Sequence, residues 1–122
     1  MAFTPYHNIT YNSGIYHNGV AAGKSIELIA PGENVERIKA IMITNTHATS
    51  DATISLFIEN NPDAVATSAF KILSTIAIPS DTSLVLDNSD IISFDNSSGG
   101  YGLYLGVGTT DGTTLVDVMI HR

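Results

Sequence analysis

The sequence predicts an all-β fold: one antiparallel β-sandwich of jelly-roll-like form over residues 24–122, preceded by an extended N-terminal arm over residues 1–23. Turn-forming residues recur about every 8 to 15 positions from Gly23 onward, and short β-branched and aliphatic runs lie between them. Hydrophobic residues make up 43% of the 122, which is enough for the core of a single domain. Charged residues make up only 14%, and the polar character comes mainly from Thr, Ser and Asn, which suit turns and the solvent-facing sides of strands.

Eight strands are expected between these turns. They are placed at residues 24–30, 35–45, 53–59, 70–78, 82–87, 90–95, 101–108 and 114–121. Successive side chains of a strand point to opposite faces, so hydrophobic alternation with a period of two supports several of these placements. In the last strand, for example, Val116, Val118 and Ile120 share one face, which we expect to be buried.

Two local patterns predict finer features. Asp111-Gly112 stands between the last two strands and is typical of a type I′ hairpin, because both central residues of that turn need positive φ. The last two strands are therefore expected to pair with each other. Asn61-Pro62-Asp63 fits the cap of one helical turn through Ala66, with proline at the first helical position, and a plain loop is the alternative.

The first 23 residues differ from the rest of the chain. They contain Tyr6, Tyr11 and Tyr16, little aliphatic content and no clean periodicity. One interpretation is a loose terminus. The other is an extended arm that packs on a neighbouring molecule, since tyrosine offers a large contact area with a polar tip. Three tyrosines in so short a stretch favour the arm.

Charge and composition argue against several classes of partner. The net charge is -7, with only five Lys and Arg residues. Nucleic acids and anionic membrane surfaces need clustered basic side chains, so we expect neither as a partner. The chain has no cysteine, hence no disulfide, thiolate zinc site or cysteine nucleophile. The N-terminus lacks the pattern of a signal peptide, and the apolar runs are shorter than a membrane span, so synthesis in a cytoplasm is expected.

The stretch GVAAGKS, Gly19 to Ser25, ends like a phosphate-binding P-loop. That motif needs four residues between its glycines and a helix after them. Only three residues separate Gly19 from Gly23, and SIELIAPG after Lys24 alternates like a strand. The stretch therefore predicts a loop that leads into the first strand of the sandwich, not a nucleotide site.

A cation site in the acidic loops is an alternative that the sequence leaves open. Asp87, Asp90 and Asp95 lie close together in the sequence, and calcium prefers several such oxygens. An EF-hand loop starting at Asp95 would need glutamate where Gly106 stands. Since Asp, Asn and Ser are also ordinary turn formers, structural turns are the favoured interpretation, and a weak cation site is the alternative.

No pattern of catalytic residues emerges. The four histidines, His7, His17, His47 and His121, show neither helical pairing nor a zinc spacing. The chain has no Gly-x-Ser-x-Gly elbow, and its carboxylates lie mostly in turns, which disfavours hydrolase and glycosidase chemistry. We therefore expect no enzyme activity, no catalytic residues, no cofactor and no bound metal.

What remains is surface for association. Phe57, Tyr104 and Met119 fall on strand faces opposite the main apolar sets. One interpretation is a jelly-roll corner that buries parts of both faces. The favoured one is a subunit interface, because large exposed apolar patches are rare on monomers. Together with the tyrosines of the arm, the interface candidates are Tyr6, Tyr11, Tyr16, Phe57, Tyr104 and Met119.

The order of strands and turns resembles that of small tailed-phage virion proteins. The segments concerned are IKAIMITNTHATSDATISLFIENN, ILSTIAIPSDTSLVLDNSDIISF and GLYLGVGTTDGTTLVDVMIHR, within residues 35–122. The resemblance is one of strand pattern and transfers no functional residues. It implies a jelly-roll-like sandwich that assembles as a ring or trimer on a phage head, neck or tail.

The expected function is therefore structural. The favoured role is a homotrimeric capsid decoration (cement) protein, made in the host cytoplasm and located in the virion, with the major capsid protein or other virion proteins as partners. Alternatives are a tail, neck or fibre component and, from a different class, a carbohydrate-binding β-sandwich module. A glycan-binding module often needs calcium, whereas a cement protein needs neither glycan nor calcium.

Overall fold

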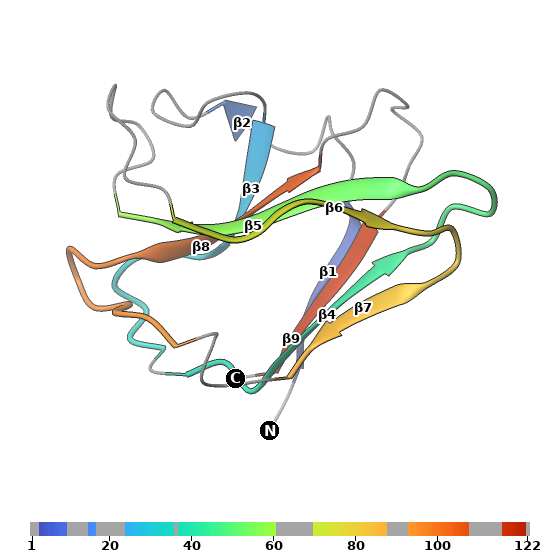
Figure 1. Cartoon of the computed structure of the whole chain (residues 1–122). Coiled ribbons are helices and arrows are strands. Elements are labelled where there is room, and N and C mark those ends of the chain that lie inside the picture. The colour runs from blue at the N-terminus through green and yellow to red at the C-terminus, as the bar shows by residue number, and fades with distance from the viewer. Residues whose placement is uncertain are drawn as a thin grey trace.

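The computed structural model describes residues 3–9, 15–16, 24–35, 37–60, 70–87, 93–107 and 116–121. These residues form strands joined by turns and bends (Figure 1). The strands are β1 (Phe3–Ile9), β2 (Ile15–Tyr16), β3 (Lys24–Ile29), β4 (Ala40–Asn45), β5 (Ala52–Glu59), β6 (Phe70–Ile78), β7 (Ser83–Leu86), β8 (Gly102–Val107) and β9 (Val116–His121). In this part of the chain, no helix is both long enough and apolar enough to cross a membrane.

The strands pair as a chain folded back on itself. β5 pairs with β6, β4 with β7, β3 with β8 and β1 with β9, all antiparallel, so that the pairs are nested around the β5–β6 connection. Successive pairs alternate between two sheets, with orders β1-β9-β4-β7 and β2-β3-β8-β5-β6. We call these sheet A and sheet B. Contacts between β9 and β4, and between β8 and β5, complete the sheets.

A long antiparallel hairpin rolled into two facing sheets is the jelly-roll arrangement. Figure 1 shows the two layers, with β5 and β8 in one and β4, β7 and β9 in the other. The predicted all-β fold, a jelly-roll-like antiparallel sandwich, is confirmed.

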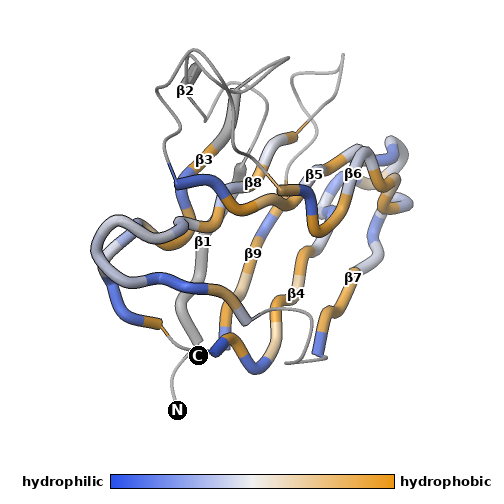
Figure 2. Tube along the Cα trace, turned by 60° about the vertical axis from the view of Figure 1, so that its left-hand side comes forward, coloured by the Kyte–Doolittle hydropathy of each residue, from blue (hydrophilic) through white to orange (hydrophobic). Residues whose placement is uncertain are grey.

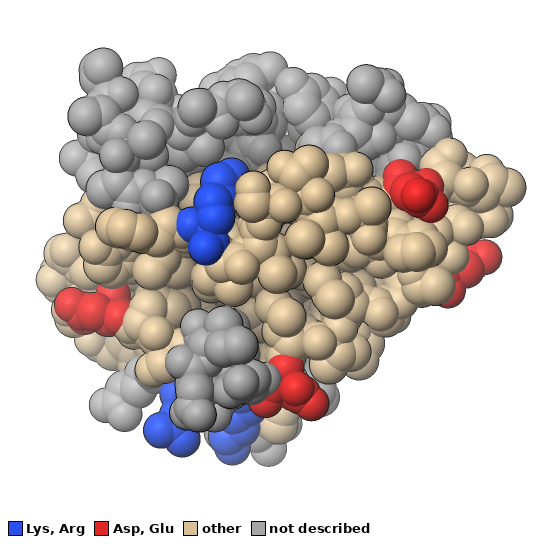
Figure 3. Space-filling view, in the orientation of Figure 1, with Lys and Arg blue, Asp and Glu red and all other residues tan. Residues whose placement is uncertain are grey.

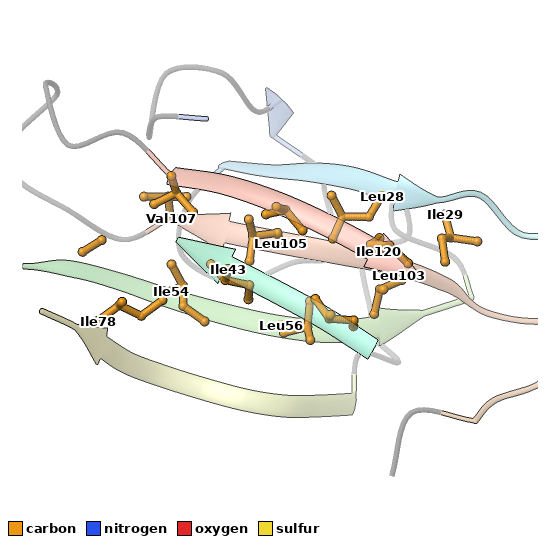
Figure 4. Packing of buried hydrophobic residues seen from close by; sticks show 14 of the residues in the cluster. Leu28, Ile29, Ile43, Ile54, Leu56, Ile78, Leu103, Leu105, Val107 and Ile120 are labelled. Atoms are coloured by element: carbon orange, nitrogen blue, oxygen red, sulfur yellow. The ribbon is translucent and has the colours of Figure 1, made fainter. Parts of the chain in front are cut away.

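The core lies between the two sheets. Side chains that alternate along the strands point inward and form one hydrophobic cluster, as the close view in Figure 4 shows. The orange segments of Figure 2 mark where hydrophobic residues lie along the chain. Full burial of each such side chain stabilises the fold by about 1.5–3 kcal/mol. The cluster consists of Leu28, Ile29, Ile38, Ile41, Ile43, Ala52, Ile54, Leu56, Ile78, Leu103, Leu105, Val107, Val116, Val118 and Ile120. The predicted inward face of the last strand is confirmed.

Two predicted strands differ from the structure. The strand expected at 35–45 begins only at Ala40, and at its predicted start the backbone N–H of Val35 donates to the Asn96 side chain. Of the strand expected at 90–95, residues 93–95 are described and are not strand. Here Asp95 Oδ1 accepts hydrogen bonds from the backbone N–H and the hydroxyl of Ser97, which turns the chain.

The predicted pairing of the last two strands is wrong. β8 lies in sheet B between β3 and β5, whereas β9 lies in sheet A between β1 and β4. The connection between them therefore crosses from one sheet to the other instead of closing a two-residue hairpin. Asp111-Gly112 itself lies outside the described residues, as does the predicted helical turn at 61–66.

The expected N-terminal arm is, in two segments, part of the sandwich. β1 pairs along β9 from Phe3↔His121 to Ile9↔Val116, and the two residues of β2 pair with Lys24 and Ser25 of β3. Residues 3–9 and 15–16 of the expected extended arm are therefore edge strands of sheets A and B. The sequence of β1 lacks the alternation that would reveal a strand, and its hydrogen-bond partners lie at the other end of the chain. Residues 10–14 and 17–23 lie outside the described part.

Candidate interaction surface

The exposed apolar side chains lie on two edge strands that follow each other in the chain. Among the described residues, the exposed large hydrophobic side chains are Phe70, Ile76 and Val85, at 57%, 37% and 49% exposure. Phe70 and Ile76 belong to β6, and Val85 belongs to β7. Exposed apolar side chains are common one at a time, but all three of these stand on edge strands, where a partner can dock.

β6 and β7 are the terminal strands of their sheets and lie on the same side of the sandwich. β6 is an edge strand of sheet B and β7 is an edge strand of sheet A, and the Pro79–Thr82 turn joins them. Figures 1 and 2 both place these strands along one side of the molecule. Most of the described surface in Figure 3 belongs to uncharged residues, with few charged side chains. Other side chains of the two strands are partly buried and pack against the core: Ile72 and Leu73 of β6, and Leu84 and Leu86 of β7. We call this side the β6–β7 face.

β6 carries a distortion that interrupts its pairing. Its register with β5 shifts between the pairs Ile54↔Ile76 and Leu56↔Leu73. Inside this interval Thr75 adopts φ of 53°, in the left-handed region that β-branched residues disfavour. The Thr75 backbone N–H donates to the hydroxyl oxygen of Ser55 at 3.0 Å, which holds the bulge in place. Bulges in edge strands limit uncontrolled strand addition.

A row of four side chains crosses the outer side of sheet B. Glu27, Tyr104, Phe57 and Lys71 are successive register partners on β3, β8, β5 and β6. The Tyr104 hydroxyl donates to Glu27 Oε2 at 3.0 Å, and its ring stacks on that of Phe57 with centroids 5.7 Å apart. Lys71 Nζ lies 4.9 Å from the Phe57 ring centroid, a cation–π contact.

This row corrects the expected role of its two aromatic residues. Phe57 is 2% exposed and Tyr104 is fully buried, so neither is an exposed interface residue of the chain. Neither belongs to the cluster between the sheets, and the sandwich therefore buries side chains on both sides of sheet B. The charged ends of the row, Glu27 and Lys71, remain exposed.

Met119 lies in a corresponding row on sheet A. Its register partner on β4 is Met42, and the partner of Met42 on β7 is Val85. Met119 and Met42 are half-buried, whereas Val85 is exposed, so this uncharged row leads to the β6–β7 face. Of the candidate tyrosines, Tyr6 lies in β1 and Tyr16 in β2, and Tyr11 lies outside the described residues.

A polar corner closes one end of the sandwich. A cavity of about 340 Å³ lies there, lined by Asn34, Val35, Phe94, Asp95, Asn96 and Ser97. Asn96 is 3% exposed and its side chain bonds three backbone groups of the chain itself. The pKa of Asp95 is lowered, first by the hydrogen bond from the Ser97 hydroxyl and then by that from its backbone N–H. These polar groups are engaged in holding loops together.

The other candidate residues serve structure where they are described. Lys24 and Ser25 begin β3, so a strand follows Gly23, as predicted, where a P-loop would need a helix. His47 Nδ1 accepts hydrogen bonds from the backbone N–H groups of Thr49 and Ser50, which orders the turn after β4. Over the described ranges, His, Asp and Glu side chains nowhere gather in threes that could hold a metal ion. Asp90 lies outside those ranges.

The interaction surface was only partly visible in the sequence. Met119 and Val85 depart from the buried set, but Phe70 and Ile76 lie in the run FKILSTIAI, which looks like a buried strand. This run is exposed because it forms an edge strand of sheet B. Chemically, the β6–β7 face offers apolar area and the backbone groups of two edge strands, which suits association with another protein.

Comparison with known proteins identifies no relative. No protein-family model, no curated protein and no solved structure matches the chain.

Proposed function

We propose that this chain is a non-enzymatic structural protein of a phage virion, a capsid decoration (cement) protein that works as a homotrimer. The observation that carries the proposal is the β6–β7 face: Phe70, Ile76 and Val85 are each exposed on one of the two edge strands that form this side of the jelly roll. An apolar edge of this kind is a liability in a free monomer, and an assembly that covers it removes the liability.

The function is mechanical. Each protomer buries apolar area against a neighbour, at about 25 cal/mol for each Å² removed from water. Three linked protomers contact several capsid subunits at once, and this multivalency strengthens attachment beyond that of one contact. Low charge suits such contacts, because fewer charged groups lose their hydration. The partners are further copies of the chain and the major capsid protein or other virion proteins, and the location is the virion.

The fold alone does not select this role, since jelly rolls occur in both viral capsid and lectin domains. One observation favours a carbohydrate-binding module instead. The exposed Phe70 ring lies edge-on to Tyr101, with centroids 5.9 Å apart, and exposed aromatic rings can stack on sugars. The aliphatic Ile76 and Val85 on the same side favour protein association, because they offer sugars neither a flat ring nor a hydrogen bond.

The first test is the mass of the protein in solution. Light scattering on a sizing column should give a discrete trimer whose mass is unchanged by EDTA. Ile76→Lys and Val85→Lys should each shift the protein toward monomer, because a buried lysine loses hydration without gaining a partner. Ser98→Lys, at an exposed loop position that belongs to neither β6 nor β7, is the matched control and should leave the trimer intact.

A wild-type monomer that binds glycans, or that changes on chelation, would replace this proposal by the carbohydrate-binding alternative. If the trimer is found, antibodies against it should label the heads of phage particles that carry the gene, in immunogold electron microscopy. Labelling confined to tails or fibres would reassign the protein to the tail, neck or fibre alternative.

A further inference from the structure

The row across the outer side of sheet B carries opposite charges at its two ends. Glu27 stands on β3 and Lys71 on β6, at the same level of the register, and both are exposed. Tyr104 and Phe57 connect them through one hydrogen bond and one ring stack. β2 pairs with Lys24 and Ser25, the first two residues of β3, and Glu27 lies farther along the strand. The outer side of sheet B therefore presents a carboxylate on β3, next to the edge strand β2, and an ammonium group on the edge strand β6.

We propose that the occupant of the β6 edge is a second copy of this chain, docked head to tail so that Lys71 of one protomer meets Glu27 of the next. This inference rests on the proposed oligomer and names the residues that join its subunits. The argument is charge complementarity: a chain of net charge -7 that binds itself needs a surface on which unlike charges face each other.

The strand directions fit this arrangement. Neighbouring strands in the order β3-β8-β5-β6 are all antiparallel, so β3 and β6 run in opposite directions within one sheet. A copy rotated about an axis along the strands therefore brings its β2–β3 edge beside this β6, with β3 antiparallel to β6 and with Glu27 of the neighbour on the side toward Lys71. Contacts between two different surfaces of identical subunits form a ring when the rotation between neighbours closes, and a rotation of one third of a turn gives a trimer.

A contact between two β6 edges lacks this complementarity. Each such edge carries Lys71 as its only charged residue, so a symmetric pair of edges would offer neither lysine a carboxylate from β6. The head-to-tail contact also covers Phe70, the neighbour of Lys71 on β6 and the most exposed large apolar side chain of the described residues.

The test is a charge swap. Lys71→Glu, Glu27→Lys and the double variant are compared with wild type by light scattering over a dilution series. Each single reversal places like charges together at all three contacts of a trimer, so the dissociation constant should rise roughly tenfold to a hundredfold, as for exposed ion pairs of ordinary strength. The double variant restores unlike charges and should return the constant toward the wild-type value. High salt should raise the dissociation constant of the wild-type trimer. It should also bring the dissociation constants of wild type and of the single variants to the same value, which is the sharper test.

Two controls separate this contact from loss of folding. Glu27→Gln removes the charge but keeps an oxygen that accepts the Tyr104 hydrogen bond, so it should weaken the trimer while the melting temperature of the dissociated protein, measured at high dilution, stays that of wild type. Lys39→Glu paired with Asp51→Lys reverses two exposed charges outside the row and should leave the trimer unchanged. Melting curves of every variant identify any that fail to fold.

Each outcome decides the matter. Folded single variants that remain trimeric, or a folded double variant no better than the worse single one, would overturn the Lys71–Glu27 contact and leave a trimer formed in some other way. A monomeric wild type would overturn both this contact and the proposed oligomer.

Discussion

At the scale of single residues, Asn96 ties three segments of the chain together. Its Oδ1 accepts from the backbone N–H of Val35 at 2.9 Å, and its Nδ2 donates to the carbonyls of Ala30 and Tyr101 at 2.9 and 2.7 Å. Its own carbonyl accepts from the N–H groups of Gly32 and Asn34. One buried side chain thereby satisfies backbone groups that the irregular loops cannot satisfy with one another.

Asn96→Ala should lower the free energy of unfolding by about 2–4 kcal/mol, because it leaves one N–H and two carbonyls of the corner without their partner. Urea unfolding followed by circular dichroism measures this change. Ser98→Ala, at an exposed position of the same loop, is the control and should change stability by less than about 0.5 kcal/mol. An Asn96→Ala protein as stable as this control would show that water replaces the side chain.

Gly100 and Gly102 explain why this corner accepts few other sequences. A Cβ at Gly100 would collide with the carbonyl oxygen of Asp95, and one at Gly102 would lie 2.7 Å from that of Ile29. The close backbone approach lets Tyr101 N–H reach the carbonyl of Asp95 at 2.6 Å. These two glycines are therefore needed because neighbouring backbone atoms leave no room for a Cβ, and not only because glycine allows unusual backbone angles.

At the scale of elements, β6 is both the most exposed long strand and the most distorted one. Most of its nine residues are exposed or half-buried, and only Ile78 is buried. The bulge at Thr75 divides it into two short segments, which limits the length over which a foreign strand can add. An edge that is apolar but interrupted is suited to a specific partner more than to open-ended aggregation.

Thr75→Asn should stabilise the protein by about 0.5–1 kcal/mol, because asparagine adopts the left-handed conformation at lower cost than a β-branched residue. Thermal unfolding measures the gain. Ser74→Asn introduces the same side chain at the exposed neighbouring position, which lacks positive φ, and should give no gain. Equal effects of the two substitutions would attribute the change to asparagine itself and not to the backbone of Thr75.

At the scale of the whole molecule, the nested pairing brings the two ends of the chain together. β1 and β9 pair with each other, and β9 then joins β1 to β4 in sheet A. The outermost pair of the rolled hairpin is thus formed between segments more than 100 residues apart in the 122-residue chain. Such long-range pairing is slow to form and depends on the rest of the fold being in place.

Deletion of residues 1–9 should destabilise the sandwich by about 3 kcal/mol or more, since it removes the hydrogen bonds between β1 and β9 at about 1 kcal/mol each. The melting temperature should fall by about 10 °C or more. Deletion of residues 1–2 alone, which leaves β1 whole, is the control. A shortened chain that melts like the control would support the arm outside the sandwich that the sequence suggested.

The sequence by itself determined the local features of the fold. The strand at 70–78 is found at its predicted bounds, and β3, β5, β7, β8 and β9 lie within two residues of theirs. Turn chemistry and period-two alternation are properties of neighbouring residues, so these strands and the inward face of the last one could be recognised without knowledge of partners.

Only the tertiary structure decided which strands are neighbours. β8 and β9 are adjacent in sequence but lie in different sheets, and β1 carries no alternation yet completes sheet A. The candidate surface depends on the same choice: Phe57 and Tyr104 look like surface residues but are buried, whereas Phe70 and Ile76 look like core residues but are exposed. Burial depends on what the rest of the chain places beside a strand, and that long-range information is absent from the alternation within the strand.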